Sequence, residues 1–327
     1  MYEDLTKKKR ELDELPPLKD DVKNALGKQM ILDFVCAGNC FDGSSLTRRE
    51  TEEILYRDMT VPKHSLTEHI RTLNLKHGFE MISEKALRHS ANPVDDKDVK
   101  EFHRIVVRGL DDKNAGMYRG FSINFGDTDI VLPDSVKVLR LMDDFGMWLF
   151  TARSLHPVTL AAEAHLRLLS IQPFADGNAA VARLLMNFLL LRAGYPPAVF
   201  ARREKREYWT AVRAAAFDNM RGEYDKIIGR AVNRGLDLYK KAAVSERIDD
   251  TDNEPYFMRI GQLAKETGER VSTLRYWTQM GLLETAGKTS ADYVLYSSDV
   301  FPQIQRLKKL KDERYTLEEI KKIVRAE

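Results

Sequence analysis

The chain has 327 residues, of which 43% are hydrophobic and 31% are charged, and its formal net charge is +2. This length predicts two domains, and the nearly balanced charge means that any DNA affinity must come from a local patch. The N-terminus lacks the apolar core and cleavage site of a secretory signal, and the longest apolar stretch, 184–191, is too short to span a bilayer. We therefore expect a cytoplasmic protein with no membrane partner.

Helical periodicity dominates the first part of the chain. Apolar residues recur at helical spacing over 46–56, 136–150, 159–169 and 181–191, with Ser45 as the expected cap of the first helix. Residues 116–133 instead alternate between apolar and polar around Gly126-Asp127, which predicts a β-hairpin. The acidic, proline-containing stretch 245–256 predicts a linker between a domain over 1–244 and another over 257–327.

A short motif, QPFADGNAAVAR, occupies 172–183 between two predicted helices. Gly177 permits a ligand to approach the backbone, and the free N–H groups at the start of the second helix form an anion site. Asp176 is a candidate ligand for a Mg²⁺ ion that bridges phosphates, and Arg183 is a candidate phosphate contact. The structural alternative is that Asp176 caps the helix and Arg183 is a solvated helix charge.

This motif resembles that of the Fic family, His-Pro-Phe-x-Asp-Gly-Asn-Gly-Arg-x-x-Arg, and segments 37–55 and 186–200 are similar to other parts of the family. The resemblance covers about residues 1–245. It implies a mainly α, Fic-type helical fold in which the hairpin is a flap that holds a target segment by strand addition. It also implies transfer of AMP from ATP to a protein hydroxyl. In that reaction Asp176 would hold the metal, Gly177 and Asn178 the phosphates, and Arg183 the distal phosphate.

Three positions depart from the family motif. Gln172 stands at the position of the catalytic histidine, Ala179 replaces a glycine, and Ala180 replaces the first arginine. A glutamine has no group that titrates near neutral pH, so it cannot carry away the proton of the attacking hydroxyl. Loss of a general base costs about 10²–10⁴ in rate, and Ala180 also removes a charged phosphate clamp. We therefore assign no catalytic residue.

Many Fic proteins carry an inhibitory Ser-x-x-x-Glu element whose glutamate pairs with the last arginine of the motif. Gly38 and Asp42 occupy the matching positions here. The resemblance therefore implies an ion pair between Asp42 and Arg183, which is either inhibitory or, with no catalysis to restrain, purely structural.

The pattern changes after Met258. A short helix with its apolar face over 260–264, a turn at Gly268 and Arg270, and a second helix over 271–277 that Ser272 can cap have helix-turn-helix spacing. The order of IGQLA, STLRYW, GLL and, near the end, YTLEEI resembles the DNA-binding domain of the MerR family over residues 257–327.

That second resemblance implies a small winged helix-turn-helix domain that binds DNA. Ser272 and Thr273 would face the major groove, and Arg275 and Tyr276 would contact backbone phosphate. Lys288, in the wing loop, would add another phosphate contact. The wing departs from the family because its usual arginine is absent and Asp292 would repel phosphate.

We interpret the chain as a DNA-binding transcription regulator. Its degenerate Fic-like domain would serve dimerisation, partner contact or nucleotide sensing, with ATP and Mg²⁺ as candidate ligands and a homodimer formed through that domain. One alternative is a Fic-type adenylyltransferase that uses DNA binding for localisation or autoregulation. Two others are a peptide-binding module that works through the flap hairpin and a C-terminal winged helix that binds protein instead of DNA.

Overall fold

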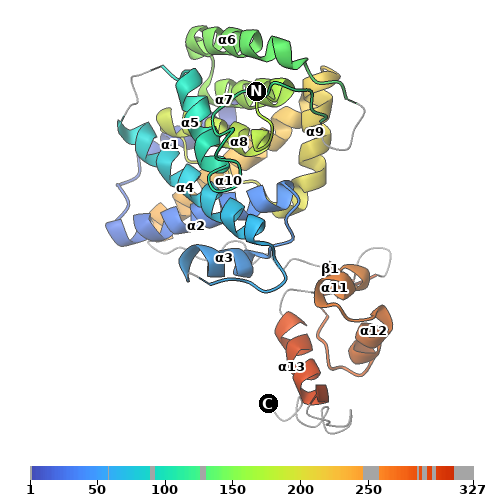
Figure 1. Cartoon of the computed structure of the whole chain (residues 1–327). Helices are drawn as coiled ribbons and strands as arrows, with labels where there is room; N and C mark the ends of the chain where they lie inside the picture. The colour runs from blue at the N-terminus through green and yellow to red at the C-terminus, as the bar shows by residue number, and fades with distance from the viewer. Residues whose placement is uncertain are drawn as a thin grey trace. The chain divides into compact units, whose positions relative to one another are not determined.

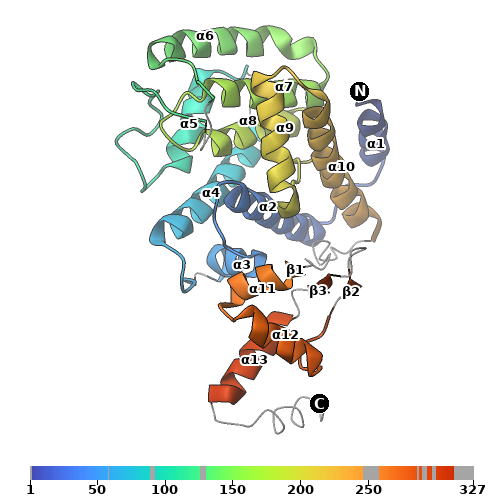
Figure 2. The same cartoon turned by 90° about the vertical axis from the view of Figure 1, so that its right-hand side faces the viewer.

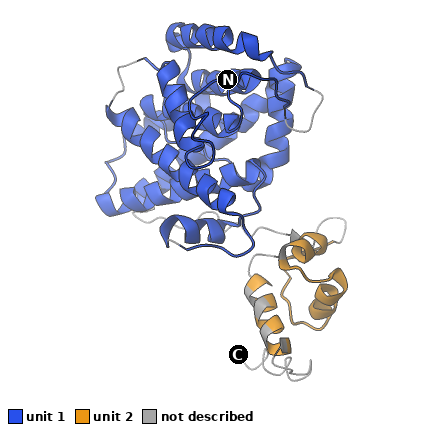
Figure 3. Cartoon of the chain, viewed as in Figure 1, with its two compact units in different colours: residues 1–248 blue, residues 249–327 orange. Residues whose placement is uncertain are grey.

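The computed structural model describes residues 2–57, 59–88, 93–125, 130–245, 258–285, 287–288, 293–296 and 300–312. The chain divides into two compact units, 1–248 and 249–327 (Figure 3). The larger unit contains the helices α1 (Glu3–Asp13), α2 (Asp20–Phe41), α3 (Arg48–Tyr56), α4 (Leu66–Arg88), α5 (Asp96–Val106), α6 (Ser135–Thr151), α7 (Pro157–Ile171), α8 (Asn178–Arg192), α9 (Lys205–Phe217) and α10 (Gly222–Ser245), with 3₁₀ turns at Ala152–Ser154 and Arg202–Glu204.

The central helix of the larger unit is α8 (Figure 1). It is apolar on nearly all sides, and such a helix is stable only when other elements surround it. It packs against α4, α5 and α7, while α10 packs against α1 and α9 (Figure 2). The predicted mainly α fold is confirmed. Among the described residues, none of the helices combines the length and the apolarity that crossing a membrane requires.

Two predicted helix caps are wrong. The side chain of Thr47 accepts a hydrogen bond from the backbone N–H of Glu50, and Glu50 accepts one in return from the backbone of Thr47. This reciprocal pair satisfies two free backbone donors, so α3 begins after Thr47 and not after Ser45. In the smaller unit Arg270 is the cap residue of α12, which places Ser272 inside the first turn.

The predicted hairpin over 116–133 contains one antiparallel bridge, between Asn124 and Val131. Its turn, residues 126–129, lies outside the described residues. The described residues on either side of that turn form no longer strand pairing.

The smaller unit contains β1 (Met258–Arg259), α11 (Ile260–Thr267), α12 (Val271–Gln279), β2 (Gly287–Lys288), β3 (Val294–Tyr296) and α13 (Val300–Asp312). The strands form an antiparallel sheet in the order β1-β3-β2. Leu263, Leu274 and Trp277 join residues of β3 and α13 in one buried cluster. The predicted helix-turn-helix is confirmed. Most of the predicted linker and the YTLEEI segment lie outside the described residues.

A loop of the larger unit passes unusually close to α10. The backbone N–H of Val199 donates to the carbonyl of Ala231 at 2.9 Å. A Cβ built on Gly235 would lie 2.1 Å from the carbonyl oxygen of Pro197. The loop and the helix can therefore be this close only if position 235 has no side chain.

We expect Gly235→Ala to destabilise the larger unit by about 1–3 kcal/mol, because the added methyl group overpacks this contact. That loss exceeds the gain of about 1 kcal/mol from better helix propensity. The matched control is Gly229→Ala in the same helix, whose Cβ would meet Tyr2 at an ordinary 3.5 Å. Urea unfolding followed by far-UV circular dichroism measures both variants. Equal stability of the two would contradict the inferred close approach.

Candidate functional site

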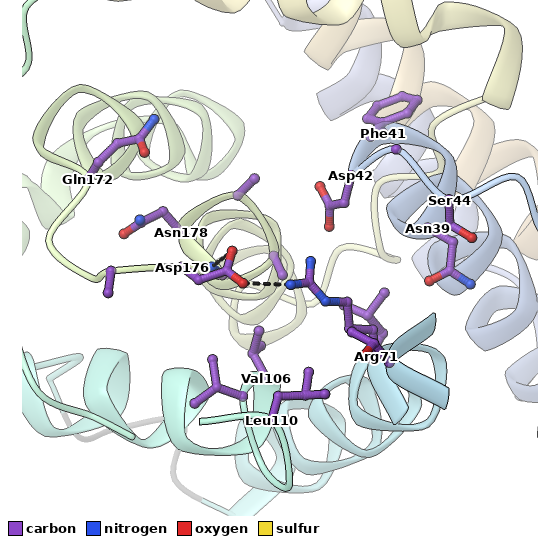
Figure 4. Close-up of a pocket in the computed structure, with 18 of the residues that line it drawn as sticks. Asn39, Phe41, Asp42, Ser44, Arg71, Val106, Leu110, Gln172, Asp176 and Asn178 are labelled. Carbon is purple, nitrogen blue, oxygen red and sulfur yellow. Dashed lines mark hydrogen bonds and ion pairs between the residues drawn. The ribbon is translucent and has the colours of Figure 1, made fainter. Parts of the chain in front are cut away.

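A cleft of about 970 Å³ opens beside the motif loop (Figure 4). Asp42, Asp176, Gly177 and Asn178 line it, as does Gln172. The walls are partly apolar, with contributions from Phe41, Leu75, Val106, Val107, Leu110, Ile123, Phe125 and Trp209. Residues predicted from distant parts of the sequence thus meet at one site.

The motif loop links α7 to α8 through two left-handed residues. Gln172 ends α7 with φ +46°, and Gly177 precedes α8 with φ +75°. A Cβ on Gly177 would lie 2.9 Å from Cγ1 of Val106 on α5. Glycine is therefore required here both by its backbone conformation and by the close packing of α5.

Asn178 holds the shape of this loop. Its side-chain oxygen accepts a hydrogen bond from the backbone N–H of Phe174 at 2.9 Å, and its amide nitrogen donates to the carbonyl of Phe174 at 2.8 Å. The side chain is buried. Its amide is thus committed to the loop backbone within the described structure.

Behind the loop lies His103, a buried histidine of α5. Its ring stacks on that of Phe174 at 3.8 Å, its Nδ1 accepts from the N–H of Gly116 at 2.9 Å, and its Nε2–H donates to the carbonyl of Asp176 at 3.2 Å. Burial lowers the pKa of His103 to about 4. The imidazole is therefore neutral near pH 7, and its nitrogens bond to the motif loop and to Gly116 of the predicted flap, so it is not a free proton acceptor.

Arg119 fastens the predicted flap segment to the motif loop. Its guanidinium is buried and donates to the carbonyls of Gln172 at 2.8 Å, Phe121 at 2.9 Å and Pro133 at 2.7 Å. These bonds join both ends of the segment to the residue that stands where the family has its catalytic histidine. Burial lowers the pKa of Arg119 from its ordinary value.

Asp176 is in contact with a cation from α4. Its Oδ2 accepts from Nη2 of Arg71 at 2.6 Å, and its Oδ1 accepts from the N–H of Gly177 at 2.7 Å (Figure 4). Among the described residues no three His, Cys, Asp or Glu side chains gather as a metal site. The Mg²⁺ ion that the resemblance implies does not fit this arrangement, because it would have to displace the guanidinium from the one motif carboxylate.

Arg183 is almost completely buried, with 1% of its side chain exposed, so its interpretation as a solvated helix charge is wrong. Its Nη2 donates to Oδ2 of Asp42 at 2.7 Å. Within the described part of the chain its Nε and Nη1 make no hydrogen bond. The position that corresponds to the family's inhibitory glutamate therefore neutralises the last arginine of the motif.

A buried polar chain leads inward from this arginine. The phenol of Tyr208 lies beside the guanidinium, and its hydroxyl is 2.8 Å from Nε2 of His165. Nδ1 of His165 is 2.8 Å from the hydroxyl of Tyr224, which donates to the carbonyl of Ala162 at 2.7 Å. Since Tyr224 uses its proton on that carbonyl, His165 carries its proton on Nδ1 and accepts from Tyr208 on Nε2.

The cleft has few candidate proton acceptors. Among the described residues that line it there is no histidine. The carboxylates of Asp42 and Asp176 are each paired with an arginine. Partial burial alone would raise the pKa of Glu68, but hydrogen bonds from Ser44 and Ser65 outweigh it and lower the pKa to about 2. A carboxylate of that pKa is a poor general base near neutral pH.

In the smaller unit four of the five predicted DNA contacts lie on one helix. Ser272, Arg275 and Tyr276 are exposed on α12, and Thr273 is half-buried. The buried side chains of the same helix, Leu274 and Trp277, fix which side faces outward. Lys288 belongs to β2, but its side chain, like Asp292, lies outside the described residues.

Sequence reasoning missed Arg71, His103 and Arg119. Arg71 is 105 residues from the aspartate that it contacts, and no local pattern marks a helical arginine as facing a distant loop. His103 lies in a capped amphipathic helix, where a core histidine is unremarkable. Only the tertiary arrangement brings these side chains to the motif.

Comparisons with known proteins identify both units. Residues 93–190 match the model of the Fic/DOC family, and residues 258–327 match that of the MerR HTH family regulatory proteins. Relatives described as protein adenylyltransferase Fic include one from Nematostella vectensis, 29% identical over 73% of this chain and 55% of the relative, and one from Drosophila persimilis, 31% identical over 72% and 44%. The chain thus spans about half the length of the curated relatives it matches.

Solved structures show the same fold in the larger unit. A Fic domain-containing signalling protein from Bacteroides thetaiotaomicron is 26% identical, with a TM-score of 0.67 over 76% of this chain and 98% of that one. Residues 134–508 of Fic-1 from C. elegans are 21% identical, with a TM-score of 0.67 over 75% of this chain and 72% of that one.

The pKa of His103 makes stability depend on pH. Between about pH 6.5 and 4 the unfolded chain binds a proton that the folded chain excludes, so the His103 contribution is complete above pH 6.5 and is lost as the pH falls toward 4. We expect His103→Gln to reduce the pH dependence of the free energy of unfolding in this window by up to about 1.4 kcal/mol per pH unit. Urea unfolding at several pH values measures it. An unchanged slope would contradict a buried, neutral imidazole.

Proposed function

Because the chain carries a Fic/DOC family domain and a MerR-type helix-turn-helix domain, we propose that it is a sequence-selective DNA-binding regulator whose Fic/DOC domain binds a nucleotide without transferring AMP. The observation that carries this proposal is the glutamine at position 172, in a cleft whose described lining includes no histidine. A general base contributes about 10²–10⁴ in rate, so its loss removes a large part of any transfer activity.

The cations of the motif support the same proposal. Arg183 is held by Asp42, and Ala180 supplies no second cation from the motif. A phosphate group would have to compete with a carboxylate for the buried guanidinium, which is a strong charge-assisted interaction. The cleft nevertheless keeps the volume and the glycine-containing loop at a helix N-terminus that suit a phosphate ligand.

The DNA-binding part of the proposal rests on α12. A recognition helix needs a buried face that fixes it to its domain and an exposed polar face that enters the groove. Leu274 and Trp277 supply the first, and Ser272, Arg275 and Tyr276 supply the second. Lys288 and Thr273 complete the contacts that we assign to this domain by resemblance.

Further partners are part of this proposal. Helix-turn-helix proteins commonly bind paired half-sites as dimers, so we propose that the chain forms a homodimer. We assign the dimer contact to the Fic/DOC domain. The predicted flap carries the exposed apolar side chains Met117, Phe121 and Val131. Such side chains beside an extended segment suit a protein partner that binds by strand addition.

The second candidate function is protein adenylylation coupled to DNA binding. Its support is the description of the curated relatives as protein adenylyltransferases and the retention of Asp176, Gly177, Asn178 and Arg183. This candidate needs a proton acceptor other than residue 172. The two functions differ in whether the intact chain labels a protein from ATP.

For DNA binding, a selection of random duplexes on the purified chain at moderate salt is expected to enrich one site. We expect Arg275→Ala to weaken binding to that site and to reduce the slope of log affinity against log salt by about one, because one phosphate contact is lost. The control, Arg49→Ala, removes an equal charge from an exposed position on α3. The absence of enrichment, or equal binding by the two variants, would count against DNA binding.

For AMP transfer, we expect incubation of the intact chain with α-labelled ATP, Mg²⁺ and a lysate to give no more protein labelling than the Asp176→Ala variant gives. The physical reason is the missing general base. Thermal unfolding of both proteins checks that they are folded. Strong labelling that Asp176→Ala abolishes would reject the regulator proposal in favour of the adenylyltransferase.

A further inference from the structure

The contact between Arg71 and Asp176 distinguishes this cleft from a metal-dependent phosphate site. Nη2 of Arg71 lies 2.6 Å from Oδ2 of Asp176, and the two side chains are 43% and 60% exposed. Both line the cleft. The pair is therefore open to a ligand, unlike the guanidinium of Arg183, whose side chain is only 1% exposed.

The guanidinium of Arg71 lies beside Oδ2 of Asp176, where a bridging metal ion would bind. Mg²⁺ binds carboxylate oxygens at about 2.0–2.1 Å and usually joins one or two of them to substrate phosphates. A Mg²⁺ ion on Oδ2 of Asp176 would meet the positive charge of Arg71 directly. The other oxygen, Oδ1, already accepts the N–H of Gly177. Both oxygens of the carboxylate are therefore already in contact with the protein, and the cation that lies on Oδ2 is Arg71.

We propose that Arg71 is the resident cation of this cleft and that the cleft binds a nucleotide phosphate without a divalent metal. A guanidinium has five N–H donors in a planar fork, which matches two phosphate oxygens at once. While Nη2 remains on Asp176, Nη1 can donate to a phosphate oxygen. Arg71 thereby replaces both the bridging metal and the guanidinium that is missing at Ala180.

The charges of the neighbouring groups favour this assignment. The N-terminus of α8, with its backbone N–H groups and positive dipole, borders the same cleft and favours an anion. Arg213 of α9 also lines the cleft. Free ATP, which carries more negative charge than its magnesium complex, gains more from these fixed cations.

The inference rests on the nucleotide-binding part of the proposed function and is tested by calorimetric titration of the full chain with ATP, in EDTA and in Mg²⁺. We expect binding in EDTA that Mg²⁺ does not strengthen. Arg71→Met should lose at least about tenfold in affinity in EDTA, because a hydrogen bond from a charged donor contributes about 1.5–3 kcal/mol. The same variant should bind better when Mg²⁺ is added, since Asp176 is then free to hold it.

Two further variants serve as controls. One removes a cation far from the contact in the sequence, and the other removes the carboxylate that Arg71 contacts. Arg49→Met removes an exposed cation from α3 and should bind ATP as the unchanged chain does. Asp176→Asn removes the only motif carboxylate and should bind ATP in EDTA equally well or better, because Arg71 is released toward the phosphate. Our proposal also predicts that Asp176→Asn keeps this binding in Mg²⁺, whereas a metal-bridged site predicts that the variant loses it. This variant and the Mg²⁺ comparison keep the proposal testable if Arg71→Met fails to fold.

The outcomes are distinguishable. Binding that appears only with Mg²⁺, or Arg71→Met that binds in EDTA as the unchanged chain does, would overturn the role of Arg71 and leave nucleotide binding intact. No binding of ATP in either buffer would overturn this inference and the nucleotide part of the proposed function together. DNA binding through α12 would be untouched by either result.

Discussion

Arg183 carries a positive charge at the centre of the larger unit, where its side chain is 1% exposed. A buried charge is tolerated only when it is paired and hydrogen-bonded. Asp42 supplies the opposite charge from the end of α2, and Tyr208 places its phenol beside the guanidinium from α9. Through His165 the chain of contacts continues to Tyr224 on α10. Side chains from α7, α9 and α10, together with Asp42 at the end of α2, thus form one chain of polar contacts that begins at this guanidinium.

The two units differ in which features of their family motifs they contain. In the smaller unit a buried face and an exposed polar face coexist on α12, as DNA recognition requires. In the larger unit Gly177, Asn178 and His103 hold the backbone of the motif loop, while position 172 is a glutamine, which has no titratable group. Because a general base contributes about 10²–10⁴ to the rate of group transfer, our proposal assigns ligand binding without efficient transfer to the larger unit.

Helices and loops could be predicted from the sequence where the pattern that marks them lies within a few consecutive turns of the chain. Apolar spacing located α3, α6, α7 and α8, and the motif with its family resemblance located the loop and the positions of Asp42 and Arg183. The side chains that complete the site could not be found in this way. Arg71 of α4 contacts the loop only in the packed structure. From the sequence alone, an arginine in a helix is interpreted as a solvated charge. The cap of α3 is Thr47 and not the predicted Ser45, because Thr47 forms the reciprocal pair with Glu50.

The packing of α5 against the motif loop restricts which substitutions this protein can accumulate during evolution. A side chain at position 177 would be strained by the left-handed backbone there, and its Cβ would also lie 2.9 Å from Cγ1 of Val106 unless Val106 became smaller. A shorter residue at 106 leaves a void under the loop until a second change fills it. We therefore expect the effects on stability of substitutions at positions 106 and 177 to be non-additive.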